Sequence, residues 1–79
     1  MRLDKFLKVS RLIKRRTVAN EACNAGRVLV NGKEAKAGTT IKIGDIIEIR
    51  FGSNITKVEV LDVKEHVKKE EADNMYRYL

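Results

Sequence analysis

Cysteine and histidine are scarce in this sequence of 79 residues, which contains only Cys23 and His66. A single cysteine cannot close an internal disulfide. One cysteine and one histidine also fall short of the roughly four ligands that a structural zinc site needs. We therefore expect no metal and no other cofactor. Cys23 is predicted to be a small core residue, and His66 is interpreted as a solvated side chain.

Long apolar runs are also absent. No stretch has the roughly 20 consecutive apolar residues of a membrane-spanning helix. Met1 is followed by charged residues rather than by the apolar segment of a signal peptide. We therefore expect a cytoplasmic protein. The chain has no internal repeat, and a fold of this size buries only about 60% of its unfolded surface, so stability should be modest.

Residue combinations that support catalysis are missing as well. The sequence has no evident carboxylate pair and no glycine loop that would cradle a phosphate. Its only histidine lies in a charged segment, and its only cysteine falls on an apolar helix face without an evident base. We therefore expect a protein that is not an enzyme.

Positive charge is concentrated at the amino terminus. The chain has 17 basic and 11 acidic residues, a formal net charge of +6. Residues 1–16 hold seven cations and one anion, Asp4, whereas residues 17–79 hold ten of each sign. Because such a local field attracts polyanions, a nucleic acid or an anionic membrane surface is the first partner to consider. The alternative is an ordinary solvated helix face.

Two helices are predicted at the start of the chain. Residues 2–9 have apolar side chains at the i, i+3 and i+4 spacing of a helix that faces a core. Those side chains are Leu3, Phe6 and Leu7. A second helix is predicted to begin between Arg15 and Thr17, with Thr17 as a candidate N-cap, and to end at Gly26. Asp4 suits the positive end of the first helix's dipole.

Short strands are predicted to follow. Residues 27–30 and 33–35 flank Asn31-Gly32, a dipeptide that readily takes the positive φ values of a type I′ hairpin turn. Further strands are predicted at residues 46–51 and 55–63. The order of elements predicts an α+β fold, in which two N-terminal helices pack on a small, mostly antiparallel sheet.

Residues 1–63 are predicted to form the domain, and residues 64–79 a charged C-terminal tail or short helix. The tail contains four scattered apolar residues that are candidate anchors: Val67, Met75, Tyr76 and Leu79.

Three segments resemble the αL RNA-binding motif, also called the S4 domain. They are Arg2–Leu7, Arg16–Ala19 and Gly26–Lys33, within roughly residues 1–50. The ordered set is specific, although Val-Asn-Gly alone would occur in many hairpins. The short length, the Lys8–Arg16 run and the Lys68–Tyr76 segment further resemble the RqcP family of stand-alone proteins, which is related to the small heat-shock RNA-binding proteins.

The resemblance implies a protein that binds ribosomal RNA, and also tRNA, on large ribosomal subunits obstructed by peptidyl-tRNA. It further implies support for an RqcH-type factor that tails the stalled nascent chain on the same subunit. We expect a monomer with no membrane partner. The family often has Ser-Arg where this chain has Arg15-Arg16, which leaves the role of Arg15 open. The alternatives are a general rRNA-binding assembly or heat-shock factor, and a basic module that binds a membrane surface or a protein.

Nine cations are candidate RNA-binding residues: Arg2, Lys5, Lys8, Arg11, Lys14, Arg15, Arg16, Arg27 and Lys33. Arginine offers phosphate a planar bidentate fork, whereas lysine acts as a point charge. We therefore rank Arg2 and Arg16 highest, and both match positions that the S4 pattern assigns to RNA contact. The alternative for Arg16 is an ion pair with Glu21 or an acidic residue of the sheet. For Arg27 and Lys33 the alternative is that they are ordinary solvated strand residues.

Overall fold

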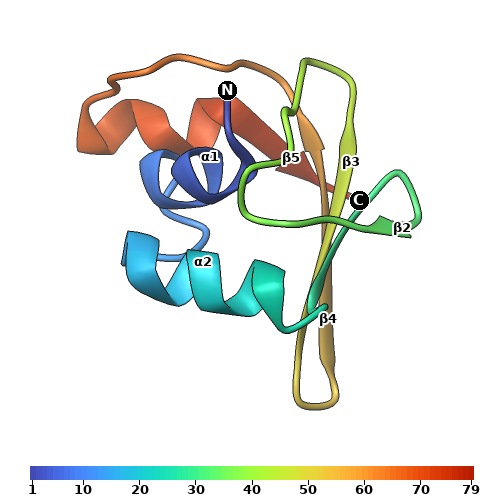
Figure 1. The fold of residues 1–79 in the computed structure, drawn as a ribbon. Coiled ribbons are helices and arrows are strands. Elements are labelled where there is room, and N and C mark those ends of the chain that lie inside the picture. Colours follow the sequence, from blue (N-terminus) through green and yellow to red (C-terminus); the bar gives the residue numbers. More distant parts are fainter.

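The computed structural model describes all 79 residues and has two layers, helices on one side and a sheet on the other (Figure 1). The helices are α1 (Leu3–Val9), α2 (Arg16–Asn24) and the 3-10 helix η1 (Lys69–Met75). The strands are β1 (Val28–Val30), β2 (Lys33–Glu34), β3 (Ile46–Phe51), β4 (Asn54–Val60) and β5 (Tyr76–Tyr78). All neighbours in the sheet are antiparallel, in the order β2-β1-β3-β4-β5. The predicted α+β fold is confirmed.

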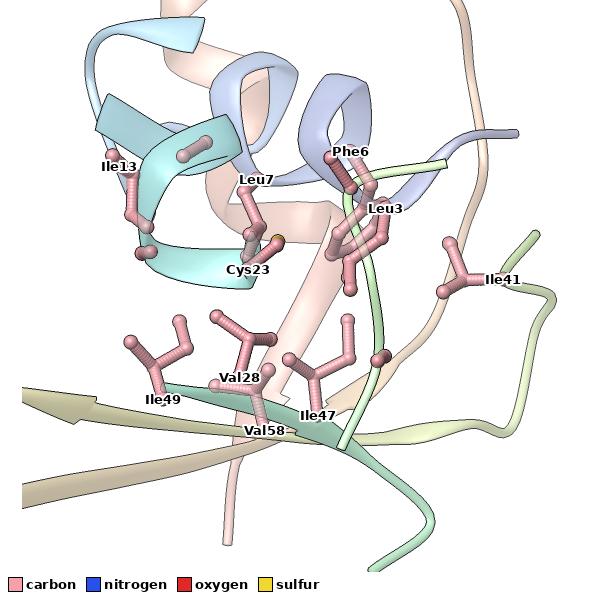
Figure 2. Packing of buried hydrophobic residues seen from close by; sticks show 14 of the residues in the cluster. Leu3, Phe6, Leu7, Ile13, Cys23, Val28, Ile41, Ile47, Ile49 and Val58 are labelled. Atoms are coloured by element: carbon pink, nitrogen blue, oxygen red, sulfur yellow. The ribbon is translucent and has the colours of Figure 1, made fainter. Parts of the chain in front are cut away.

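The core fills the space between the helices and the sheet. Leu3, Phe6 and Leu7 of α1 are fully buried, as their spacing predicts. Figure 2 shows them pointing toward Val28 and Ile47 of the sheet. Other buried members of the same cluster come from α2, the connecting segments and the strands; they include Cys23, Ile13, Ile41, Ile49 and Val58. The prediction that Cys23 is a core residue is confirmed.

The start of α1 is tied to the segment that precedes β3. Arg2 forms an isolated antiparallel bridge with Thr40. The backbone N–H of Leu3 donates to the carbonyl of Thr39 at 2.8 Å, and that of Asp4 donates to the carbonyl of Ala37 at 3.1 Å. These bonds satisfy N–H groups that the first turn of a helix leaves unpaired. They also fix the backbone from which the side chains of Arg2 and Asp4 project.

The predicted turns are present. Asn31 and Gly32 have φ values of 53° and 83°, the positive values that a type I′ turn requires between β1 and β2. Gly26, with φ of 76°, follows the end of α2. The prediction that Thr17 caps α2 is wrong, because the cap position is occupied by Arg15 and no side chain caps this end.

The C-terminal segment contributes to the sheet. β5 pairs with β4, so that Tyr76 lies opposite Val60 and Tyr78 opposite Val58. Met75 is buried, as predicted for an anchor, whereas Leu79 is exposed. A strand was not predicted here, because three residues are too few to show an alternating pattern.

The longest helices and strands are short. α2 has nine residues, and no helix has the length and apolar character that crossing a bilayer requires.

Candidate RNA interface

A buried carboxylate joins the two N-terminal helices. Only 2% of Asp4 is exposed. Its Oδ1 accepts hydrogen bonds from Arg2 Nε at 3.2 Å and from the backbone N–H of Lys5 at 2.8 Å. Its Oδ2 accepts from Arg2 Nη2, Arg16 Nε and Asn20 Nδ2, each at 3.4 Å. Donors from α1, from α2 and from the residue before α1 therefore converge on one side chain.

The two arginines that bind Asp4 remain half exposed. The exposed side-chain fractions are 54% for Arg2 and 48% for Arg16. Arg16 uses only its Nε toward Asp4, so both of its Nη groups are free of partners within the chain. Arg2 uses Nε and Nη2, which leaves its Nη1 free. Since a guanidinium carries five N–H donors, both arginines keep donors for an external acceptor.

The same contacts control the charge of Asp4. Burial raises the pKa of this carboxyl group, but the hydrogen bonds from Asn20, Arg16 and Arg2 and the positive charge of Arg16 outweigh burial. The net result is a pKa below the usual value of 3.8. Asp4 is therefore ionised at neutral pH, and the set formed by Arg2, Asp4 and Arg16 carries one net positive charge.

The lowered pKa of Asp4 predicts acid sensitivity of the fold. A carboxyl group whose pKa is lower in the folded state stabilises the fold above its unfolded-state pKa, here near 3.8. That contribution is lost as the pH falls through the folded-state pKa. We expect the melting temperature to fall more steeply below about pH 4 in the wild type than in Asp4→Asn. Thermal melts from pH 6 to pH 2 measure this, and identical acid-side slopes would contradict it.

A second group of cations lies around the α1–α2 connection. Lys8, Arg11 and Lys14 line a polar hollow together with His66 and Glu65 of the C-terminal segment. None of the three cations, nor Arg15 beside them, forms an ion pair within the chain. Lys5 differs, because its Nζ is paired with Glu65. Lys8, Arg11 and Lys14 therefore offer positive charge that no carboxylate of the chain pairs with.

Two of the nine predicted residues lie apart from this group. Arg27 lines a different hollow, with Arg50 and the glycines at positions 26 and 52. Lys33 is exposed. Its strand, β2, lies at the edge of the sheet. The structure therefore joins Arg2 and Arg16 on Asp4, and it gathers Lys8, Arg11 and Lys14 around one hollow. Arg27 and Lys33 belong to neither group.

The outer face of the sheet has little unpaired charge. Arg50 and Lys57 both pair with Glu48, and Arg77 Nη2 lies 2.6 Å from Glu59 Oε1. Register places Glu48 opposite Lys57, and Glu59 opposite Arg77, so these two pairs cross between neighbouring strands, whereas Arg50 and Glu48 lie on the same strand. The cations on this face of β3, β4 and β5 are thus compensated within the chain.

Sequence reasoning missed three members of the candidate interface: Asp4 as an acceptor, Asn20 and His66. It also assigned the wrong alternative partner to Arg16, which pairs with Asp4 rather than with Glu21 or the sheet. Two signals were available. Asp4 is the only anion among the first sixteen residues, and Asn20 lies four residues after Arg16, on the same side of a helix.

Comparison with known proteins identifies relatives along the whole chain. The S4 domain family model matches residues 1–47. A protein of Halalkalibacterium halodurans called RQC P-site tRNA stabilizing factor is 63% identical over 76 residues, which cover 96% of this chain and 86% of the relative. The Bacillus subtilis protein of the same name is 56% identical over 79 residues, covering 100% of this chain and 92% of the relative.

A solved structure supports the same placement. The trimeric heat shock protein 15 of Vibrio cholerae superposes with a TM-score of 0.91 at 30% identity, covering 100% of this chain and 81% of that one. The arginine pair on Asp4 lies inside the segment that the family model matches. The chain therefore belongs to the S4 domain family, among relatives that carry the name RQC P-site tRNA stabilizing factor.

Proposed function

We propose that this chain is a non-enzymatic RNA-binding protein of ribosome-associated quality control. It binds ribosomal RNA and P-site tRNA on large ribosomal subunits that are obstructed by peptidyl-tRNA. The observation that carries the proposal is the half-exposed arginine pair on Asp4, together with the unpaired cations Lys8, Arg11 and Lys14 that line one polar hollow. The names of the relatives support the choice of P-site tRNA as one ligand.

The chemistry of this surface suits a folded RNA. Double-helical RNA has a deep, narrow major groove, so a protein that reads a stem recognises mainly its shape and the positions of its phosphates. Arg2 and Arg16 supply planar forks for phosphate oxygens or base edges, whereas Lys8 and Lys14 act as point charges. The fixed backbone at Arg2 and the helical start at Arg16 hold these groups in place.

The proposed role in quality control follows from the bound ligands. A protein that contacts both rRNA and the trapped tRNA stabilises the tRNA on the separated subunit. In this position it supports C-terminal tailing of the stalled nascent chain by an RqcH-type factor on the same subunit. It works in the cytoplasm as a monomer, without chemistry of its own.

Co-sedimentation with purified ribosomal particles tests the proposal. Large subunits that carry peptidyl-tRNA should retain the protein more tightly than empty large subunits, because only the former offer both ligands. Small subunits and free rRNA fragments are the control particles. Equal retention on empty and obstructed large subunits would favour a general rRNA-binding assembly or heat-shock factor, for which the fold similarity to heat shock protein 15 provides the specific precedent.

Salt dependence provides a quantitative prediction for the same complex. If about four or five phosphates are neutralised, log affinity should fall against log salt concentration with a slope of roughly −3 to −4. Filter binding or co-sedimentation between about 50 and 200 mM salt measures the slope. An affinity that does not depend on salt would exclude a phosphate-dominated interface.

A further inference from the structure

The position of Asp4 within a cationic surface is unexpected on charge alone. A carboxylate lowers the local positive potential and repels phosphate, so a polyanion-binding surface should bind better without it. Asp4 is nonetheless one of the three buried polar or charged residues of the chain, and its carboxylate accepts hydrogen bonds from both arginines. Its role must therefore lie in what it does to these neighbours.

The carboxylate holds both guanidinium groups by the same edge. Arg2 and Arg16 are fourteen positions apart in the sequence, yet both direct Nε to Asp4, at 3.2 and 3.4 Å. Arg16 uses Nε alone and keeps both Nη groups free of partners within the chain, whereas Arg2 also uses Nη2 and keeps only Nη1 free. Because the guanidinium is planar, this arrangement sets the orientation of the free donors as well as the position of the group.

The carboxylate is itself immobilised, so it can serve as a fixed support. Asp4 is enclosed by the fold, its own N–H donates to Ala37, and its Oδ1 accepts from the N–H of Lys5. Asn20 binds Oδ2 and also accepts a hydrogen bond from Asn24 at 3.0 Å. Neither asparagine carries charge; Asn20 restrains the carboxylate on the α2 side, and Asn24 restrains Asn20.

We propose that Asp4 is a positioning residue, which increases RNA affinity by holding Arg2 and Arg16 in a binding orientation before RNA arrives. Long exposed side chains lose rotamer freedom when they bind, and a prior restraint removes part of that loss from the binding step. The ligand is a phosphate-bearing surface of folded RNA, contacted by the outward Nη groups. The inference rests on the proposed function.

A pair of charge-matched variants tests it. Asp4→Asn and Glu70→Gln each remove one negative charge, but Glu70 is exposed on η1, forms no ion pair and lies outside the hollow that Asp4 and Arg16 line. The probe is the purified large subunit carrying peptidyl-tRNA. We expect Asp4→Asn to weaken binding about tenfold, although it makes the protein more positive, and Glu70→Gln to leave binding unchanged or slightly tighter. Equal affinities of the two variants would overturn the inference while leaving the proposed function intact.

A variant that lacks both arginines distinguishes a positioning role of Asp4 from a general structural role. In Arg2→Ala/Arg16→Ala, Asp4 has no arginine to orient, so adding Asp4→Asn should change the remaining affinity less than about twofold. A further tenfold loss in that background would show that Asp4 acts through the general fold, and would overturn the inference. Wild-type protein that fails to bind these subunits would instead overturn the proposed function, and the inference with it.

A second variant covers the case in which Asp4→Asn folds poorly. Arg2→Lys/Arg16→Lys keeps Asp4 and both positive charges but removes the Nε edge and the planar fork. We expect it to bind about as weakly as Asp4→Asn. Affinity equal to that of the wild type would overturn the inference, because charge alone would then suffice.

Discussion

Replacing Phe6 with alanine should lower the free energy of unfolding by about 3 to 5 kcal/mol, the usual cost of removing a buried phenylalanine ring. Phe6 is 0% exposed and lies between α1 and the sheet (Figure 2). A chain of this length has a total stability of only about 4 to 12 kcal/mol, at roughly 0.05 to 0.15 kcal/mol per residue. The variant should therefore be close to unfolding at room temperature, which urea denaturation monitored by circular dichroism measures.

The chain contains its own control for this experiment. Its only other phenylalanine, Phe51, is 40% exposed at the end of β3. Phe51→Ala removes the same ring but leaves a smaller cavity, so it should cost about 1 kcal/mol. If the two variants lost equal stability, Phe6 would not be the centre of the core.

Elements specified by local patterns were predictable from the sequence. The spacing of Leu3, Phe6 and Leu7 identified the buried face of α1, because side chains three and four positions apart meet on one side of a helix. Asn31 and Gly32 identified the first hairpin through the backbone conformations that they permit. Both signals lie within a few neighbouring residues, so no knowledge of the fold is needed to interpret them.

Features that depend on distant contacts were not predictable. β5 exists because its backbone completes the edge of β4, and its three residues carry no strand pattern of their own. The contact between Asp4 and Arg16 spans twelve positions and forms only when α1 and α2 pack together. The isolated negative charge of Asp4 indicated a special position, but its local interpretation as a partner of the helix dipole missed the two arginines.

The candidate interface was partly predictable for the same reason. The excess of cations within residues 1–16 is a local property, because α1, the start of α2 and the residues that flank and connect these helices carry all seven. Arg27 and Lys33 were included for their positions beside the hairpin, and the sheet carries them to other parts of the surface. A set of charged residues in the sequence thus predicts one charged surface only where the segments that carry these residues pack against one another.

Loss of both arginines should have the largest effect on RNA binding. We expect Arg2→Ala/Arg16→Ala to bind obstructed large subunits about 100-fold more weakly than the wild type, because hydrogen bonds that involve a charged group contribute about 1.5 to 3 kcal/mol each. The variant also leaves the buried carboxylate of Asp4 with only Asn20 and the Lys5 N–H as donors. Some stability should be lost with them, so binding is to be measured well below the melting temperature of the variant.

A charge-matched double variant distinguishes a site from a general field. Arg50→Ala/Arg77→Ala removes the same two positive charges from the outer face of the sheet, where both arginines are paired with carboxylates. If RNA were attracted only by net charge, the two double variants would lose affinity to the same extent. A site predicts otherwise: the sheet variant should bind within about threefold of the wild type, because screening by salt limits the reach of an exposed charge to about 10 Å. Equal losses would reduce the interface to a diffuse positive surface, in which neither Arg2 nor Arg16 has a specific contact.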